Sequence, residues 1–288
     1  MSHLPPYRGR FAPSPTGPLH FGSMVAAIGS YLQARSQGGE WLVRIEDLDP
    51  PRETAGASAA ILRTLERFGL YWDGEVIYQS QRSAAYIEAL DQLQRDGLLY
   101  FCRCSRSEYG PIYHGHCRHS HARTGALRVV THDEEISFND GLCGLFRQRL
   151  ESEIGDFVVR RADGLFAYQL AVVVDDAAQS ISEVVRGSDL LDNTPRQIYL
   201  QQLFGYPTPS YVHLPIALNG QGQKLSKQTG AAAIDAMPPT QLLLQVLVFL
   251  GQQPPSDLAK ATLEEMWRWA ITHWQLGVIP VSAEYSSR

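Results

Sequence analysis

Strand-like and helix-like segments alternate along the first hundred residues, and this alternation limits the chain to few folds. The stretches 8–13 (RGRFAP) and 41–47 (WLVRIED) are typical of strands, and residues 21–36 are typical of a helix between them. Further strands are expected at 75–80 and 98–104, with helices over 61–68 and 86–97. Because strands that alternate with helices usually form βαβ units, the sequence predicts an α/β fold with a mostly parallel sheet.

The middle of the chain interrupts this rhythm. Residues 102–150 are rich in cysteine, histidine and turn residues, so we interpret them as an insertion. Regular patterns return at 156–176, where Ala162-Asp163-Gly164 suggests a hairpin turn, and at 193–205, which is typical of a helix. After residue 237 the chain is expected to be helical, over 242–251 and 257–275.

Composition and charge exclude several classes of protein. Hydrophobic residues make up 44% of the 288 residues and charged residues 19%, as in ordinary globular proteins. No apolar run reaches the roughly 18–20 residues that span a bilayer, and the N-terminus has no secretory signal, so we expect a cytoplasmic protein that does not bind a membrane. The net charge of −5 does not indicate a nucleic-acid partner. Two arginine clusters could still contact phosphate, or simply be solvated: Arg103, Arg106, Arg118 and Arg123, and Arg147, Arg149, Arg160 and Arg161.

A rigid loop precedes the first predicted helix. Its sequence, APSPTGPLHFGS (12–23), holds three prolines, two glycines and His20. The loop would lie at the carboxyl end of a parallel strand, where open α/β sheets bind their ligands. A helix start attracts phosphate, Gly22 lets a ligand approach the backbone, and His20 can donate a hydrogen bond to phosphate oxygens. The pattern favours a preorganised nucleotide site, although a Pro-rich turn with a helix cap would look the same.

A lysine pair far along the chain could serve the same nucleotide. Lys224 and Lys227 bracket Ser226 in KLSKQ (224–228), which follows a Gly- and Gln-rich stretch. Two lysines on such a loop could neutralise the charge that develops on a leaving pyrophosphate. Taken alone, the motif is equally typical of a solvated loop.

Together, the two elements resemble the HIGH and KMSKS signatures of class I aminoacyl-tRNA synthetases. Four blocks are similar to matching blocks of the glutamyl-tRNA synthetases, in the same order: GRFAPSPTG (9–17), LVRIEDLDPPR (42–52), VVRGSDLLDNTPRQIYL (184–200) and HLPIALNGQGQKLSKQ (213–228). HFGS lacks the second histidine of HIGH, and KLSKQ lacks the final serine of KMSKS.

The resemblance implies a domain organisation and a nucleotide substrate. Residues 1–101 and 151–237 would form the two halves of a Rossmann-like catalytic domain, 102–150 a zinc-binding insertion, and 238–288 a small helical C-terminal subdomain. ATP with Mg²⁺ would bind at His20, Gly22, Ser23, Lys224 and Lys227, with His20 and Lys227 in catalytic roles.

A glutamate substrate needs cations for its carboxylates and an anion for its ammonium group. Arg10 and Arg186 are candidate cations, because the planar guanidinium binds a carboxylate with two hydrogen bonds. Glu46 is the candidate for the ammonium group, and Tyr168 could add a hydroxyl contact. The resemblance places amino-acid binding on these four residues and on Ala12 and Ser14. Each charged group could instead form a structural ion pair, and the sequence does not assign either arginine to a particular carboxylate.

Closely spaced cysteines indicate a metal. Cys102, Cys104 and Cys117 offer three thiolates, and Zn²⁺ requires a fourth ligand. Generic chemistry favours His114, His116 or His119, with Tyr113 as the other candidate. The pattern C-x-C…Y-x-x-x-C resembles the zinc site of the glutamyl-Q tRNA(Asp) synthetases, which implies Tyr113 and a structural zinc. Cys143 is expected to be a buried thiol.

The segment after the KMSKS-like loop is short, at about 60 residues. Complete glutamyl-tRNA synthetases have a large anticodon-binding region there, so we expect no such domain and doubt ordinary tRNA charging. The resemblance to glutamyl-Q tRNA(Asp) synthetases implies tRNA-independent activation of glutamate and its transfer to queuosine in the anticodon loop of tRNA(Asp). We expect a monomer, although the sequence itself does not determine the oligomeric state. Two alternatives stay open: a catalytically silent binding module, and glutamyl transfer to a small molecule or protein.

Overall fold

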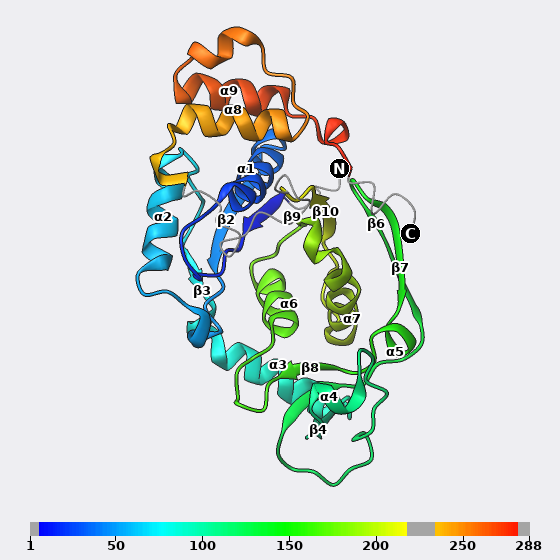
Figure 1. Ribbon diagram of the computed structural model, residues 1–288. Helices are drawn as coiled ribbons and strands as arrows, with labels where there is room; N and C mark the ends of the chain where they lie inside the picture. The colour runs from blue at the N-terminus through cyan, green and yellow to red at the C-terminus, as the bar shows by residue number, and fades with distance from the viewer. Residues whose placement is uncertain (1–5, 218–233, 282–288) are drawn as a thin grey trace.

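Five strands form the parallel part of the fold in a computed structural model that describes residues 6–217 and 234–281 (Figure 1). β1 (Arg8–Phe11), β2 (Glu40–Ile45) and β3 (Ile77–Tyr78) pair in parallel, as do β9 (Glu183–Gly187) and β10 (Ser210–Leu214). β9 lies beside β1, where the Ser182 amide donates to the Arg8 carbonyl at 2.9 Å. The strand order therefore reverses at β1, and a ligand crevice is expected at the carboxyl ends of β1 and β9.

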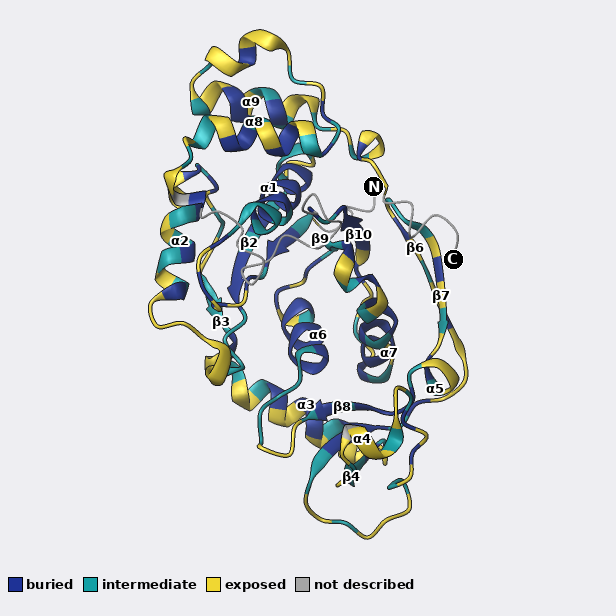
Figure 2. Ribbon diagram, viewed as in Figure 1, coloured by how far each residue is buried: buried dark blue, intermediate teal, exposed yellow. Residues whose placement is uncertain are grey.

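Helix α1 (Phe21–Ser36) is the central helix of this half. It packs on β1 and β9 with one side and on α8 (Pro239–Phe249) and α9 (Leu263–His273) with the other. Figure 2 shows α1 buried along most of its length. A helix that is covered on both sides has apolar residues all round, which explains the unbroken run from Met24 to Ile28.

Two hydrophobic cores meet at β9. Val185 belongs to the core that holds α1, β1, β2, α2 (Ala57–Arg67), α8 and α9. Val184 belongs to a second core that holds α3 (Ser83–Arg95), α6 (Tyr168–Ala178) and α7 (Thr194–Phe204). Successive side chains of a strand point to opposite faces, so β9 contributes to both cores at once.

Residues 99–160, which include the expected insertion 102–150, form an antiparallel sheet and a two-stranded ribbon. β4 (Leu99–Cys102), β5 (Ala126–Val129) and β8 (Phe157–Arg160) form the sheet, and β6 (Glu135–Asp140) and β7 (Gly144–Arg149) form the ribbon. Short helices α4 (Arg106–Tyr109) and α5 (Leu150–Glu153) flank them. The strand expected at 98–104 is present but does not join the parallel sheet, and the division expected between residues 101 and 102 falls inside β4.

Most expected elements are present, with changes at their ends. β3 is only two residues long, and the hairpin at 162–164 reduces to a bridge between Arg160 and Phe166, after which α6 begins. The helix expected over 257–275 divides into a short 3₁₀ turn and α9. The 3₁₀ turns within the described ranges are η1 (Pro50–Arg52), η2 (Gln79–Arg82), η3 (Ser188–Asn193), η5 (Ile234–Ala236), η6 (Ser256–Lys260) and η7 (Leu276–Val278). Over residues 6–217 and 234–281, none of the helices could span a bilayer.

Candidate active site and metal centre

A cavity of about 650 Å³ opens at the carboxyl ends of β1, β2 and β9. Arg10 lies in β1, Glu46 directly follows β2, Tyr168 begins α6, and Arg186 lies in β9. The residues proposed from the sequence to bind an amino acid all line this cavity: Arg10, Ala12, Ser14, Glu46, Tyr168 and Arg186. The reversal of strand order thus brings together side chains from four separate segments.

The buried carboxylate of Asp176 holds the Arg10 side chain at the base of the cavity. Arg10 forms a bidentate ion pair with Asp176 of α6, and Arg44 of β2 donates to the same carboxylate at 2.8 Å. Arg44 is fully buried and also donates to Gln179 at 2.6 Å. Arg44 also lies 3.7 Å from the Glu46 carboxylate and 3.9 Å from the Asp175 carboxylate, so the two guanidinium groups belong to a buried ion-pair network with three acidic side chains.

Glu46 presents a buried carboxylate oxygen without a hydrogen-bond partner among the described residues. Its nearest ion-pair partner, Arg44 Nη2, is 3.7 Å away, which is beyond hydrogen-bond distance. Burial raises the pKa of Glu46 to about 7, although Arg44 and Arg10 oppose this shift. An unsatisfied acceptor of this kind suits a cationic ligand group that donates hydrogen bonds.

Arg186 is held by neutral groups. Nη2 donates to Thr194 Oγ1 at 2.8 Å, Nη1 lies 3.4 Å from the Tyr168 hydroxyl, and Nε lies 3.1 Å from His213 Nε2. Burial raises the pKa of Tyr168, so this hydroxyl stays protonated near pH 7. Arg186 can therefore offer a full positive charge to the cavity.

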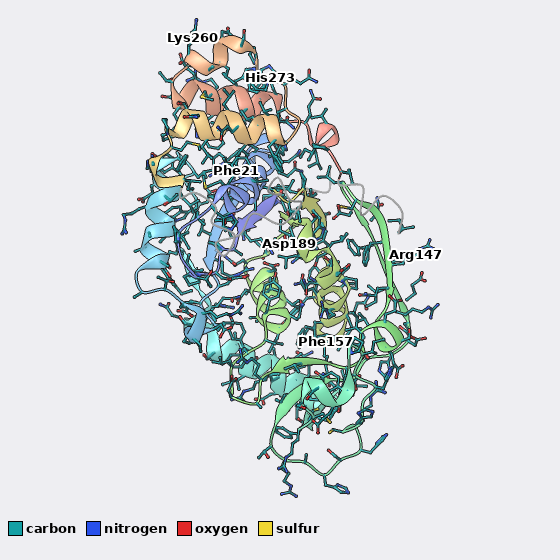
Figure 3. The ribbon with its side chains drawn as sticks, viewed as in Figure 1. Phe21, Arg147, Phe157, Asp189, Lys260 and His273 are labelled. Atoms are coloured by element: carbon teal, nitrogen blue, oxygen red, sulfur yellow. The ribbon has the colours of Figure 1, made fainter. Side chains whose placement is uncertain are left out.

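A second cleft of about 180 Å³ adjoins the first, because Ala26 and Gly187 line both. His20, Gly22 and Ser23 line the second cleft, as does Asp189, which Figure 3 labels. The His20 side chain caps α1, since Nδ1 accepts from the Ser23 amide at 3.2 Å. Lys224 and Lys227 lie outside the described residues.

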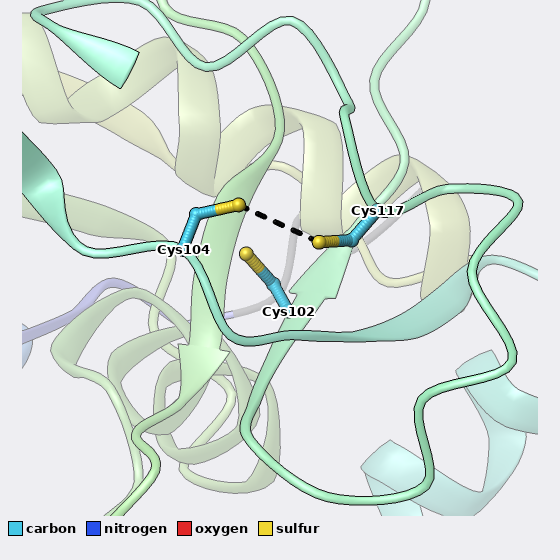
Figure 4. A group of neighbouring side chains, drawn as sticks. All are labelled: Cys102, Cys104 and Cys117. Atoms are coloured by element: carbon cyan, nitrogen blue, oxygen red, sulfur yellow. Dashed lines mark hydrogen bonds between the residues drawn. The ribbon is translucent and has the colours of Figure 1, made fainter. Parts of the chain in front are cut away.

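Three cysteines form a compact group in the insertion (Figure 4). Cys104 Sγ and Cys117 Sγ lie 3.5 Å apart, and Cys102 Sγ lies within 4.8 Å of both. Sulfurs bound to one tetrahedral zinc ion would be about 3.8 Å apart, because each lies about 2.3 Å from the metal. The spacing of these thiols therefore fits a metal site.

Tyr113 supplies an oxygen at the same place. Its buried hydroxyl oxygen lies 3.2 Å from Cys102 Sγ and 3.8 Å from Cys104 Sγ, and it accepts from the Cys117 amide at 3.0 Å. No histidine nitrogen joins the three thiols in the described part of the chain. The hydrogen bond from Tyr113 lowers the pKa of Cys117 to about 7, which favours a thiolate.

Contacts with the segment before β8 hold Tyr113 in place. The Asp156 amide donates to the Tyr113 carbonyl at 3.0 Å, and Gly155 pairs with Tyr113 as an isolated bridge. The Asp156 carboxylate binds Arg118, the residue after Cys117, with two bonds of 2.6 and 2.7 Å. This cysteine group is therefore fixed to the antiparallel sheet.

Several residues that shape the site were missed at the sequence level. Asp176, Arg44, Asp140 and His213 are buried and do not belong to the predicted set. For Arg44 and His213 the signal is a charged or polar residue inside an apolar run, as Arg44 is in WLVRIED, whereas Asp140 in SFNDGL gives no such signal. Cys143 is only partly buried, contrary to our expectation, and burial raises its pKa to about 12.

The site lies within a recognisable class of catalytic domain. Residues 7–112 and 113–274 match the family model of the catalytic domain of class I tRNA synthetases (E and Q). The glutamyl-Q tRNA(Asp) synthetase of Dechloromonas aromatica (strain RCB) is 55% identical over 291 residues, covering 96% of each chain. The enzyme of the same name from Neisseria meningitidis (strain FAM18) is 52% identical and covers 96% of this chain. The chain therefore belongs to the glutamyl-Q tRNA(Asp) synthetase family and is a ligase of the aminoacyl-tRNA synthetase type.

A solved structure agrees with this assignment. A glutamate tRNA ligase from Elizabethkingia meningosepticum, crystallised with its amino acid, superposes with a TM-score of 0.81 at 26% identity. The match covers 97% of this chain and 68% of that chain. The α/β fold is thus the one expected from the sequence.

Proposed function

We propose that the protein activates L-glutamate with ATP, without tRNA, and transfers the glutamyl group to queuosine at the wobble position of tRNA(Asp). The observation that carries this proposal is the pair of adjoining cavities. The lining of one includes Arg10, Arg186 and the unsatisfied carboxylate of Glu46, and the lining of the other includes the start of α1. The names of the relatives supply the acceptor.

Each part of an amino acid finds a complementary group in the larger cavity. Glu46 would accept the ammonium group, and Arg10 and Arg186 would bind carboxylates, with Tyr168, Ala12 and Ser14 completing the site. Within this proposed binding set, Arg10 and Arg186 would match the two carboxylates of an amino acid with an acidic side chain, and Glu46 would match its ammonium group.

Activation requires no general base from the protein. The glutamate carboxylate attacks the α-phosphorus of ATP, the bond to pyrophosphate breaks, and glutamyl-adenylate forms, so positioning and charge stabilisation supply the catalysis. His20, Gly22 and Ser23 would contact ATP in the smaller cleft. Lys224 and Lys227 would neutralise the pyrophosphate, and Mg²⁺ would accompany the nucleotide.

A structural zinc ion would bind Cys102, Cys104, Tyr113 and Cys117. The ion would fix the loop from β4 to β5, which holds the exposed Arg103 and Arg123. These arginines are candidates for phosphate contacts with an RNA, whereas Arg118 already pairs with Asp156. A hydroxyl of the vicinal diol of queuosine would then attack the glutamyl carbonyl of the adenylate, and AMP would leave as the ester forms, as with a terminal ribose in ordinary charging.

The proposal is tested by two assays on the full chain, taken to be a cytoplasmic monomer. Glutamate-dependent exchange of labelled pyrophosphate into ATP is expected without tRNA, and glutamine and aspartate should not support it. Labelled glutamate should then appear on tRNA(Asp) that carries queuosine and not on tRNA(Asp) that lacks it. No exchange would indicate a silent binding module, and exchange without tRNA labelling would indicate another acceptor.

A further inference from the structure

A buried hydrogen-bonded chain connects Arg186 to the β6–β7 ribbon. Asp140, the last residue of β6, places Oδ2 2.6 Å from His213 Nδ1, and His213 Nε2 lies 3.1 Å from Arg186 Nε. The side chains of Asp140 and His213 are fully buried. His213 is also the direct partner of Arg186 in the β9–β10 pairing. Neither Asp140 nor His213 lines the described cavities.

The hydrogen bonds of Asp140 and His213 determine which ring nitrogen of His213 carries the proton. Asp140 Oδ1 accepts from the amides of Leu142, Cys143 and His213, at 2.9 to 3.3 Å, which leaves Oδ2 for the imidazole. Burial lowers the pKa of His213 to about 4, so the ring is neutral near pH 7. Its single N–H therefore lies on Nδ1 and points to Asp140, and Nε2 accepts from Arg186.

This arrangement orients Arg186 without neutralising it. His213 and Thr194 hold Nε and Nη2, and no carboxylate pairs with Arg186 in the described part of the chain. Arg10 differs, since Asp176 binds it directly. A neutral acceptor fixes the guanidinium plane while its charge remains available to a ligand.

We propose that Asp140 and His213 are positioning residues for the amino-acid substrate. Asp140 keeps His213 in the tautomer that accepts from Arg186, and Arg186 is thereby aimed at a substrate carboxylate. The inference rests on the proposed function, because it takes Arg186 as a ligand of glutamate. It also means that the ribbon, which belongs to the insertion, contributes to an amino-acid pocket in the catalytic half.

The substitution Asp140→Asn tests the tautomer directly. Its oxygen can still accept from the three backbone amides, but its NH₂ group would donate to His213 Nδ1. The ring proton would move to Nε2, where it meets the N–H of Arg186 donor to donor. We expect the Kd and KM for glutamate to rise about tenfold or more, and the KM for ATP to stay within about twofold.

A matched pair at His213 separates the two hydrogen bonds. In His213→Asn the amide lies where Nδ1 was and keeps only the bond to Asp140, so we expect it to resemble Asp140→Asn. In His213→Gln the amide oxygen reaches the place of Nε2 and can accept from Arg186, so glutamate affinity should be largely restored. Cys143→Ala removes the contact between Cys143 Sγ and the His213 carbonyl but no contact of Arg186. It should therefore leave the KM for glutamate unchanged.

The readouts are calorimetric binding of glutamate to the full chain and the kinetics of pyrophosphate exchange. A wild-type protein that does not bind glutamate would overturn the proposed function and this inference together. A wild type that binds glutamate, with Asp140→Asn at the same Kd, would overturn the inference alone. Equal losses for glutamate and ATP, or a His213→Gln variant as weak as His213→Asn, would also overturn it.

Discussion

Arg10 and Asp176 form a buried bidentate ion pair, with Nε 3.1 Å from Oδ1 and Nη2 3.3 Å from Oδ2. The pair joins β1 to α6, and Arg44 of β2 binds the same carboxylate. One acidic side chain thus fixes two strands and a helix around the cavity.

Replacing Asp176 with Asn should destabilise the protein and weaken its pocket. Two buried guanidinium groups would lose their shared counter-charge, and we expect the free energy of unfolding to fall by about 3–5 kcal/mol. Urea denaturation measures the loss. Glu264→Gln removes the exposed partner of Arg268 and should cost less than about 0.5 kcal/mol. Similar costs for the two variants would contradict a structural role for the buried pair.

Glutamate binding should depend on pH through Glu46. The carboxyl group is neutral below its pKa of about 7 and anionic above it, and only the anion attracts an ammonium group. Between pH 6 and pH 8 the ionised fraction rises about tenfold, so the Kd for glutamate should fall by about the same factor. Calorimetry across this range tests the expectation. A Glu46→Gln variant should bind weakly and lose this pH dependence, and a flat profile for the wild type would refute the role.

The zinc content and zinc affinity of the purified protein and its variants should show whether Tyr113 is a metal ligand. Purified protein should carry about one zinc ion per chain, and Cys104→Ser should lose most of it. Tyr113→Phe should lower zinc affinity in competition with a chelator, whereas His116→Ala should not, although the His116 ring packs against Tyr113. Retention of wild-type affinity by Tyr113→Phe would remove the tyrosine from the ligand set.

Gly155 should tolerate alanine less well than Gly144 does. Both have a φ of +76°, so both substitutions carry the cost of a left-handed backbone. A Cβ at 155 would lie 2.1 Å from the Tyr113 carbonyl oxygen, whereas a Cβ at 144 meets nothing within 4 Å. We expect Gly155→Ala to cost about 1–3 kcal/mol more than Gly144→Ala in thermal or urea unfolding. Equal costs would show that the segment next to Tyr113 can move aside.

The sequence predicted helix α1 and strand β2 well, because local patterns decide both. Residues 21–36 were expected to be helical, and α1 has the same bounds. The run AYQLAVVVDD was harder, since its β-branched residues follow a hairpin turn and give no helical period. The structure places them in α6, where Val172, Val173 and Val174 are all buried, so tertiary packing overrides propensity.

The sequence allowed us to propose the charged residues Arg10, Glu46 and Arg186, which line the cavity. It did not allow us to predict the residues that hold them in place. Arg10, Glu46 and Arg186 follow from motifs at the ends of strands. Asp176 and His213 act through contacts between segments far apart in the chain, and no local pattern gives such a partner. A charge within an apolar run marks a buried ion pair, but it does not name the other member.

The division of β9 between two cores has a consequence for evolution. Val184, Val185 and Arg186 follow one another, so a slip of one residue would send each valine to the wrong core and turn the arginine to the opposite side. A register error that turns the Arg186 side chain away from its native side would therefore also disrupt both hydrophobic cores. Selection for correct folding therefore also preserves the orientation of Arg186 in the ligand pocket.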